Sequence, residues 1–232
     1  TLASTINSSN DAITFGAIAL GANTVINAAG GAIVTGNITG TSGQDITITS
    51  TGGSTNTALI NGTIGAGGNI NTIAATGTSG LQFAGNIATN DAAGNTFTAT
   101  GSTIDFNDIT IDTDATNNDG NVIFNVDTVV DSVTTDVGTA IFQITPVTTS
   151  AVIELARTNS GAINEGVFYD LDNVIVQQAA FALVGSPSHT GNIFIGNDLA
   201  AMVHAQESNV QIQNSSSGQI LLSSDYTSAN GF

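Results

Sequence analysis

Side chains that could bind a cation gather between residues 112 and 120. Asp112, Asp114, Asn117 and Asp119 supply carboxylate and amide oxygens, and a turn-forming Gly120 follows them. Calcium takes about six to eight oxygen ligands, and extracellular calcium is concentrated enough to fill weak sites. A polar loop that keeps the chain soluble would have the same composition, and no bidentate Glu follows. We therefore expect no cofactor, with calcium bound by these four residues as the alternative.

The other residues capable of chemistry are few. His189 and His204 are the only histidines and the chain has no Cys, so a zinc site lacks ligands. Asp170 and Asp172 alternate, which on a strand would place a carboxylate pair for polysaccharide hydrolysis on one face. Alternate strand residues share a face wherever Asp occurs, however. We predict a protein without catalytic activity and keep a polysaccharide-active enzyme as the alternative.

The charge balance narrows the set of partners. The chain has one Arg, no Lys and 18 acidic residues, which gives a net charge of −17. Nothing here neutralises phosphates, so nucleic acid is excluded as a partner, and anionic membrane surfaces attract basic segments instead. No apolar run approaches the roughly 18 residues that span a bilayer. We therefore expect neither nucleic-acid binding nor membrane insertion.

The elements that position these residues are short strands in a repeating pattern. Period-2 alternation of β-branched and polar residues recurs, as in residues 45–49 and 108–112, with Gly and Asn clusters between. A large apolar residue also recurs along the chain. The first three examples precede a Gly-Asn-Ile or Gly-Thr-Ile unit, and the last three precede an amide residue. Successive examples are separated by 26, 23, 23, 18 and 18 residues. These lead positions are Val34, Ile60, Phe83, Phe106, Phe124 and Phe142.

This drifting period predicts an all-β fold, a right-handed parallel β-helix with coils of about 18–26 residues. Like residues stack on successive coils of such a solenoid. With a register of 18, Phe106, Phe124 and Phe142 would form an aromatic stack, and the residues after them (Asn107, Asn125, Gln143) an amide ladder. The same register places no Asp between residues 105 and 136 on another Asp, as stacked strands require, and only Asp136 meets a like charge, Glu154.

Two Thr-x-Thr segments, at Thr47 and at Thr96, have the pattern with which β-helices bind ice. Such arrays need matching pairs on successive coils. On the next coil we expect Asn71 and Ile73 at the positions beside Thr47 and Thr49. Because neither is Thr, the array would be interrupted there. These threonines are therefore predicted to be ordinary exposed strand residues.

The organisation of the chain changes near residue 155. Residues 1–154 are predicted to form regular coils, and residues 155–232 irregular coils and a cap that continues the first part. The only Arg, Arg157, both His and both Tyr lie in the second part, where Asn197 and Asp198 could begin a short helix. A pilin-like β-sandwich is an alternative, suggested by residues 13–16.

Residues 12–150 resemble the β-helical passenger domains of Gram-negative autotransporters. The Gly-Asn-Ile units carry this resemblance, and residues 61–87 (NGTIGAGGNINTIAATGTSGLQFAGNI) are particularly similar to repeats of rickettsial surface antigens. It implies a secreted protein on the bacterial cell surface. We therefore expect a structural fibre, stalk or adhesin, whose partners are further copies of itself, stacked end to end, and a host or neighbouring cell surface.

Overall fold

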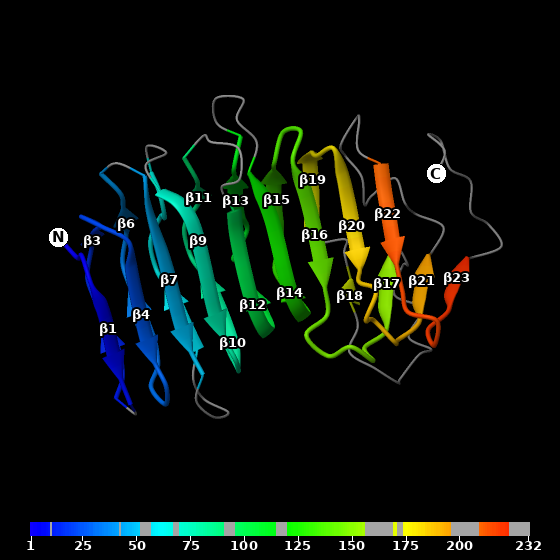
Figure 1. Ribbon diagram of the computed structural model, residues 1–232, viewed down its shortest axis with the longest axis horizontal. Coiled ribbons are helices and arrows are strands. Elements are labelled where there is room, and N and C mark those ends of the chain that lie inside the picture. Colours follow the sequence, from blue (N-terminus) through cyan, green and yellow to red (C-terminus); the bar gives the residue numbers. More distant parts are fainter. Residues whose placement is uncertain are drawn as a thin grey trace.

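The computed structural model describes residues 1–9, 11–41, 43–51, 57–66, 70–90, 96–114, 120–155, 169–170, 174–195 and 209–222. In these residues the protein is all-β without helices, and its parallel strands stack as a β-solenoid, which confirms the predicted fold class (Figure 1). Strands at the front of Figure 1 run downward while the chain advances from left to right, which is a right-handed coil. No helix in the described part is long and apolar enough to cross a membrane.

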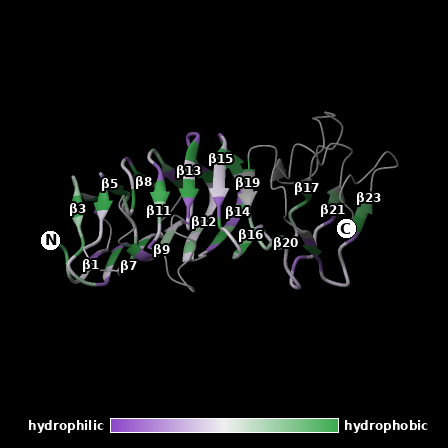
Figure 2. Ribbon diagram, turned by 90° about the horizontal axis from the view of Figure 1, so that it is seen from above, coloured by the Kyte–Doolittle hydropathy of each residue, from purple (hydrophilic) through white to green (hydrophobic). Residues whose placement is uncertain are grey.

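One side of the solenoid is a long parallel ladder, which we call ladder A. Its neighbouring strands are hydrogen-bonded in the order β1 (Thr5–Ser8), β4 (Thr24–Ala28), β7 (Gln44–Ser50), β9 (Ile70–Gly77), β12 (Thr96–Asp105), β14 (Asn121–Val130), β16 (Ile141–Thr145), β20 (Phe181–Gly185) and β22 (Asn209–Gln213). In Figure 2 these strands lie along one side of the molecule.

Shorter strands close each coil. A second side holds β2 (Ile13–Thr14), β5 (Ile33–Thr35), β8 (Thr57–Ile60), β10 (Gly80–Phe83) and the end of β12. A third side holds β3 (Ile18–Ala19), β6 (Ile38–Thr39), β11 (Ile87–Ala88), β13 (Ile109–Asp112), β15 (Val133–Asp136) and β19 (Val174–Gln178). A four-stranded sheet near the C-terminal end comprises β17 (Ile153–Leu155), β18 (Tyr169–Asp170), β21 (Ile193–Ile195) and β23 (Ile220–Leu222).

Alternation in the sequence decides which side chains enter the core. In β7, the side chains of Ile46 and Ile48 are fully buried, whereas those of the residues that follow each of them, Thr47 and Thr49, are half-exposed. The same alternation runs through β9, β12 and β14, so one continuous apolar core extends along the solenoid. Every strand pair in the described residues is parallel, as between Ile13 and Ile33. The antiparallel pilin-like sandwich is therefore wrong.

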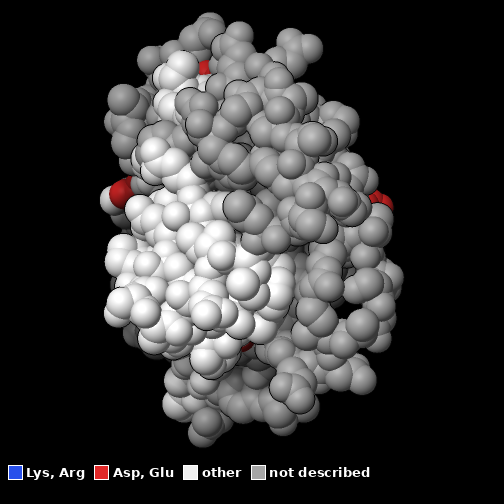
Figure 3. All heavy atoms as spheres, turned by 90° about the vertical axis from the view of Figure 1, so that its right-hand side faces the viewer, with Lys and Arg blue, Asp and Glu red and all other residues white. Residues whose placement is uncertain are grey.

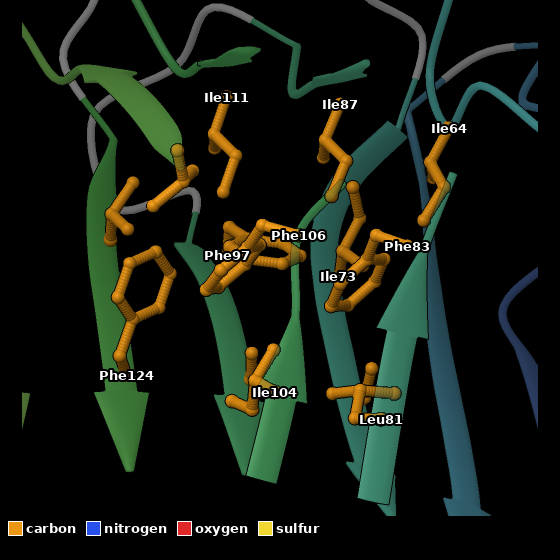
Figure 4. Packing of buried hydrophobic residues seen from close by; sticks show 14 of the residues in the cluster. Ile64, Ile73, Leu81, Phe83, Ile87, Phe97, Ile104, Phe106, Ile111 and Phe124 are labelled. Carbon is orange, nitrogen blue, oxygen red and sulfur yellow. The ribbon is translucent and has the colours of Figure 1, made fainter. Parts of the chain in front are cut away.

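Phenylalanine rings form a contact chain inside this core, which confirms the predicted aromatic stack (Figure 4). The rings of Phe83 and Phe106 are nearly parallel, and their centroids lie 5.8 Å apart. Those of Phe106 and Phe124 are 4.8 Å apart, and those of Phe124 and Phe142 5.3 Å. Phe97 contacts both Phe83 and Phe124 edge to face.

The predicted register of 18 residues is wrong. Val122, not Phe124, pairs with Phe142, a shift of 20 residues, and Phe97 pairs with Val122, a shift of 25. Phe106 follows the end of β12, and its N–H donates to the carbonyl of Val130 at 3.1 Å. Its ring reaches Phe124 across the core from another part of the coil, so the equal spacing does not measure the coil length.

The predicted amide ladder of Asn107, Asn125 and Gln143 is wrong, because it depended on the register of 18 residues. Asn107 has a left-handed backbone (φ 46°) in the turn after β12. Asn125 lies between Thr100 and Thr145, and Gln143 lies beside Ile123. The three amides therefore occupy different columns.

The prediction that no Asp between residues 105 and 136 lies beside another Asp is also wrong, because Asp112 on β13 pairs directly with Asp136 on β15.

The Gly-Asn-Ile units form a repeated corner of the coil. Ile38, Ile64 and Ile87 bridge one another on consecutive coils, as the signature predicts. The backbones approach so closely that a Cβ on Gly85 would lie 2.6 Å from the carbonyl carbon of Gly62, which explains the glycines. One lead position is displaced: Val34 pairs with Leu59, and Thr35 with Ile60.

Asparagine oxygens tie one corner to the next. Asn37 Oδ1 accepts the N–H of Thr63 at 3.1 Å, and Asn86 Oδ1 accepts that of Thr110 at 3.0 Å. At the following corner Asp108 Oδ1 accepts the N–H of Ser132 at 3.1 Å. Each side chain satisfies a donor that the turn leaves without a ladder partner, so the corner amides are structural.

The predicted division at residue 155 stays a prediction. Strands β20 and β22 continue ladder A beyond it. Arg157 and the helix expected from Asn197 and Asp198 lie outside the described residues.

Candidate functional site

The predicted calcium ligands begin at the end of β13. Asp112 Oδ1 accepts the N–H of Asp114 at 2.9 Å, a local turn that ends the strand. Asn117 and Asp119 lie outside the described residues. In the described part of the chain no three His, Asp or Glu side chains are grouped to hold a metal ion. The calcium site therefore stays a prediction. A melting temperature that rises with millimolar calcium in the wild type, but not in Asp114→Asn, would establish it.

The same strand-ending turn recurs at two other aspartates. Asp136 Oδ1 accepts the N–H of Gly138 at 3.3 Å, and Asp105 Oδ1 accepts that of Asn107 at 3.1 Å. The shared geometry gives these carboxylates a structural role where strands end.

His189 lies in the turn between β20 and β21 and is almost completely buried, with 1% of its surface exposed. Within the part of the chain that the structure describes, neither ring nitrogen has a hydrogen-bond partner, and burial lowers the pKa of the imidazole. Its backbone N–H donates to the carbonyl of Ser186 at 3.0 Å, and its carbonyl accepts the N–H of Ser215 at 2.8 Å. His204 lies outside the described residues.

One carboxylate of the predicted pair falls on a described strand. Asp170 is in β18, where its backbone pairs with Glu154 of β17, while Asp172 lies outside the described residues. Neighbouring parallel strands are about 4.8 Å apart, so two acidic residues occupy adjacent positions here. Sequence reasoning missed this pairing of Glu154 because the register of 18 placed Glu154 beside Asp136.

The outward face of ladder A carries a column of polar side chains. Asn27, Thr49, Thr76, Thr100 and Asn125 follow one another on consecutive strands. Asn125 Nδ2 donates to Thr100 Oγ1 at 3.2 Å along the column.

The residues predicted to interrupt the Thr segments are wrong, but the interruption itself is present, because Ala74 follows Thr47. Thr47 and Thr49 lie beside Ala74 and Thr76 instead of Asn71 and Ile73. The register between β7 and β9 shifts near Gln44, which no periodicity in the sequence indicates.

Comparison with protein-family models, curated proteins and solved structures gave no match. The structure itself defines the class as a β-solenoid, consistent with a passenger-like β-helix. The resemblance to autotransporter passengers rests on the sequence motifs alone.

Proposed function

We propose that the protein is a non-catalytic structural element of the bacterial cell surface, a fibre, stalk or adhesin-type solenoid that associates end to end. The observation that carries this proposal is the unbroken ladder A, whose strands share one apolar core. A solenoid of this kind gains length by adding coils, since each coil contacts only its neighbours.

The N-terminal coil supports end-to-end association. One edge of β1 is hydrogen-bonded to β4. The N–H of Val25 donates to the carbonyl of Ser4, and the N–H of Ala29 donates to the carbonyl of Ser8. In a parallel strand alternate residues point to opposite edges, so the backbone groups of Thr5 and Asn7 point away from β4. No strand in the described residues pairs with that outer edge.

The core is also incompletely covered at this end. Ile6 is partly exposed, whereas its partner Ile26 on β4 is fully buried. A further coil laid on β1 would bury Ile6 and pair the free backbone groups, as edge strands favour. Seen from the opposite end, most of the visible described atoms belong to uncharged residues, and a few acidic atoms lie among them (Figure 3).

The location and partners follow from the resemblance to autotransporter passengers. Because the chain has no Cys, a long apolar core and not disulfides would stabilise it in an extracellular setting, where a host or neighbouring cell surface is the partner.

A polysaccharide-active enzyme is the second candidate function, favoured by the paired positions of Glu154 and Asp170. Hydrolysis of any member of a panel of neutral and acidic polysaccharides, lost in Glu154→Gln and Asp170→Asn, would replace the structural proposal.

Light scattering at rising protein concentration tests end-to-end association. The wild type is expected to gain mass continuously. Asn7→Pro removes an N–H from the free edge while leaving the bonds to β4, so its mass should not keep increasing with concentration as that of the wild type does. Asn7→Ala keeps the N–H and should behave as the wild type. A monomeric wild type at every concentration would contradict the proposal.

A further inference from the structure

The outward side of ladder A differs from the rest of the molecule in charge. We define the outer face as the outward side chains of β4, β7, β9, β12, β14 and β16, which are half-exposed or exposed. From β4 to β16 these are mostly Thr, Asn and Gln with a few aliphatic residues. The exposed acid among the described residues of the face is Asp45 at the start of β7, where Oδ2 accepts Asn23 Nδ2 at 2.9 Å. Asp127 of β14 is buried, and its carboxylate accepts the N–H and the hydroxyl of Thr148. Asp105, at the end of β12, pairs with Gln82 of the second side.

The described carboxylates lie mainly elsewhere. Asp105 ends β12 on the second side, and Asp112 and Asp136 end strands on the third. Asp108 and Asp131 occupy corners with left-handed backbones. Within the described residues, this broad side thus carries few of the acids that give the chain its net charge of −17.

The chemistry of this face suits contact with a surface like itself. Thr49, Thr76 and Thr100 each present a methyl group and a hydroxyl group, and the hydroxyl both donates and accepts. Aliphatic side chains such as Val25 and Ile123 lie among them. Figure 1 looks onto the strands of this face, which lie side by side.

We propose that this face binds a second copy of the chain, face to face, about a two-fold axis. Any other side of one copy would bring carboxylates against the partner, and like charges disfavour association. Two outer faces meet with almost no charge, in the aligned packing of a β-sandwich about 10 Å apart. This lateral pairing is independent of end-to-end stacking, because it uses the side of the solenoid and leaves both ends free.

The area predicts a weak dimer. Six strands at about 4.8 Å, each about five residues wide, cover roughly 450–500 Å² per copy. The two faces together approach about 1,000 Å², the lower limit of specific interfaces. Pairing should therefore appear only at high protein concentration, and salt should strengthen it by screening the acidic sides.

Small-angle X-ray scattering together with sedimentation equilibrium tests the proposal. Lateral pairing should raise the cross-sectional radius of gyration with concentration, whereas end-to-end stacking raises only the length. In the Asn7→Pro background, which removes end stacking, the mass should approach that of a dimer and no larger species.

Paired variants identify the face. Thr76→Asp with Thr100→Asp places two charges in its centre and should weaken the dimer at least about tenfold, since like charges across the interface cost several kcal/mol. Thr14→Asp with Thr110→Asp adds the same charge at exposed positions on the other two sides and should leave the dimer unchanged. Circular dichroism and melting temperature check that both double variants fold.

The alternatives give distinct results. A monomer at every concentration and salt, or a dimer equally sensitive to both double variants, overturns the proposal. So does a monomer that inhibits ice recrystallisation through Thr76 and Thr100, because the face would then bind ordered water.

Discussion

Asp112 and Asp136 occupy paired positions on the neighbouring strands β13 and β15, so two acidic residues are direct neighbours in the ladder. Each is half-exposed, and each uses Oδ1 to accept the N–H of the residue two positions later. The solenoid thus tolerates a like-charge pair, which normally destabilises a sheet, where both acids end their strands by the same turn.

Replacing one member of this pair should stabilise the protein. Asp136→Asn keeps an Oδ1 acceptor for Gly138 and removes the repulsion, so we expect a gain of about 0.5 kcal/mol that shrinks in high salt. Asp105→Asn is the matched control. Asp105 also ends a strand but accepts Gln82 Nε2 at 2.8 Å and meets no acid, so this variant should not gain stability. Chemical denaturation at low and high salt measures both, and equal gains would contradict the explanation.

The centre of the aromatic chain should dominate stability. The Phe124 ring contacts those of Phe97, Phe106 and Phe142, and its side chain is fully buried. Phe124→Ala is expected to cost about 3–5 kcal/mol through lost burial and a cavity. Ile123→Ala, at the adjacent outward position, should cost less than about 1 kcal/mol. Similar costs in urea denaturation would show that the core is not where the register places it.

Acid should destabilise the fold through His189. Because burial lowers the pKa of this imidazole below its ordinary 6.5, the unfolded chain binds its proton first. The stability contributed by the neutral ring is therefore present above pH 6.5 and is lost as the pH falls below it. The melting temperature should drop between pH 7 and 5 in the wild type but much less in His189→Leu. Parallel pH profiles for the two proteins would refute this.

A second group, Asp108, should make the stability of the fold depend on pH at lower pH values than His189 does. Hydrogen bonds from Ser132 lower the pKa of Asp108 below 3.8. The stability that this carboxylate contributes is present above that value and is lost only at lower pH. The two groups can therefore be separated by pH.

Cysteine pairs can measure the coil register directly, since the chain has no Cys of its own. Ile123 and Gln143 are paired positions, so cysteines there should cross-link on oxidation. Cysteines at Asn125 and Gln143, 18 residues apart, lie diagonally at about 8 Å, beyond the roughly 7 Å limit for a disulfide. Thiol counting after mild oxidation distinguishes the two pairs. Efficient cross-linking of the second pair alone would contradict the structure.

The sequence was sufficient to predict the solenoid and the aromatic contacts. Alternating β-branched residues and a recurring corner, as at Ile38, Ile64 and Ile87, are local patterns that survive changes in coil length. Phe106 and Phe124 contact each other as predicted, but from different parts of their coils.

The register could not be predicted from spacing. Successive coils differ in length, from a shift of 20 between Val122 and Phe142 to one of 40 between Phe142 and Ala182. An inserted loop changes the coil length without disturbing the core on either side, so equal residue spacing carries no information across it. The pairs Asp112–Asp136 and Thr49–Thr76 were missed for this reason.

Electron microscopy of the purified protein at rising concentration tests the central claim most directly. A structural solenoid that stacks end to end should appear as rods whose lengths increase with concentration from the roughly 40 Å of a single ladder A. Compact particles of one size at every concentration would contradict the account.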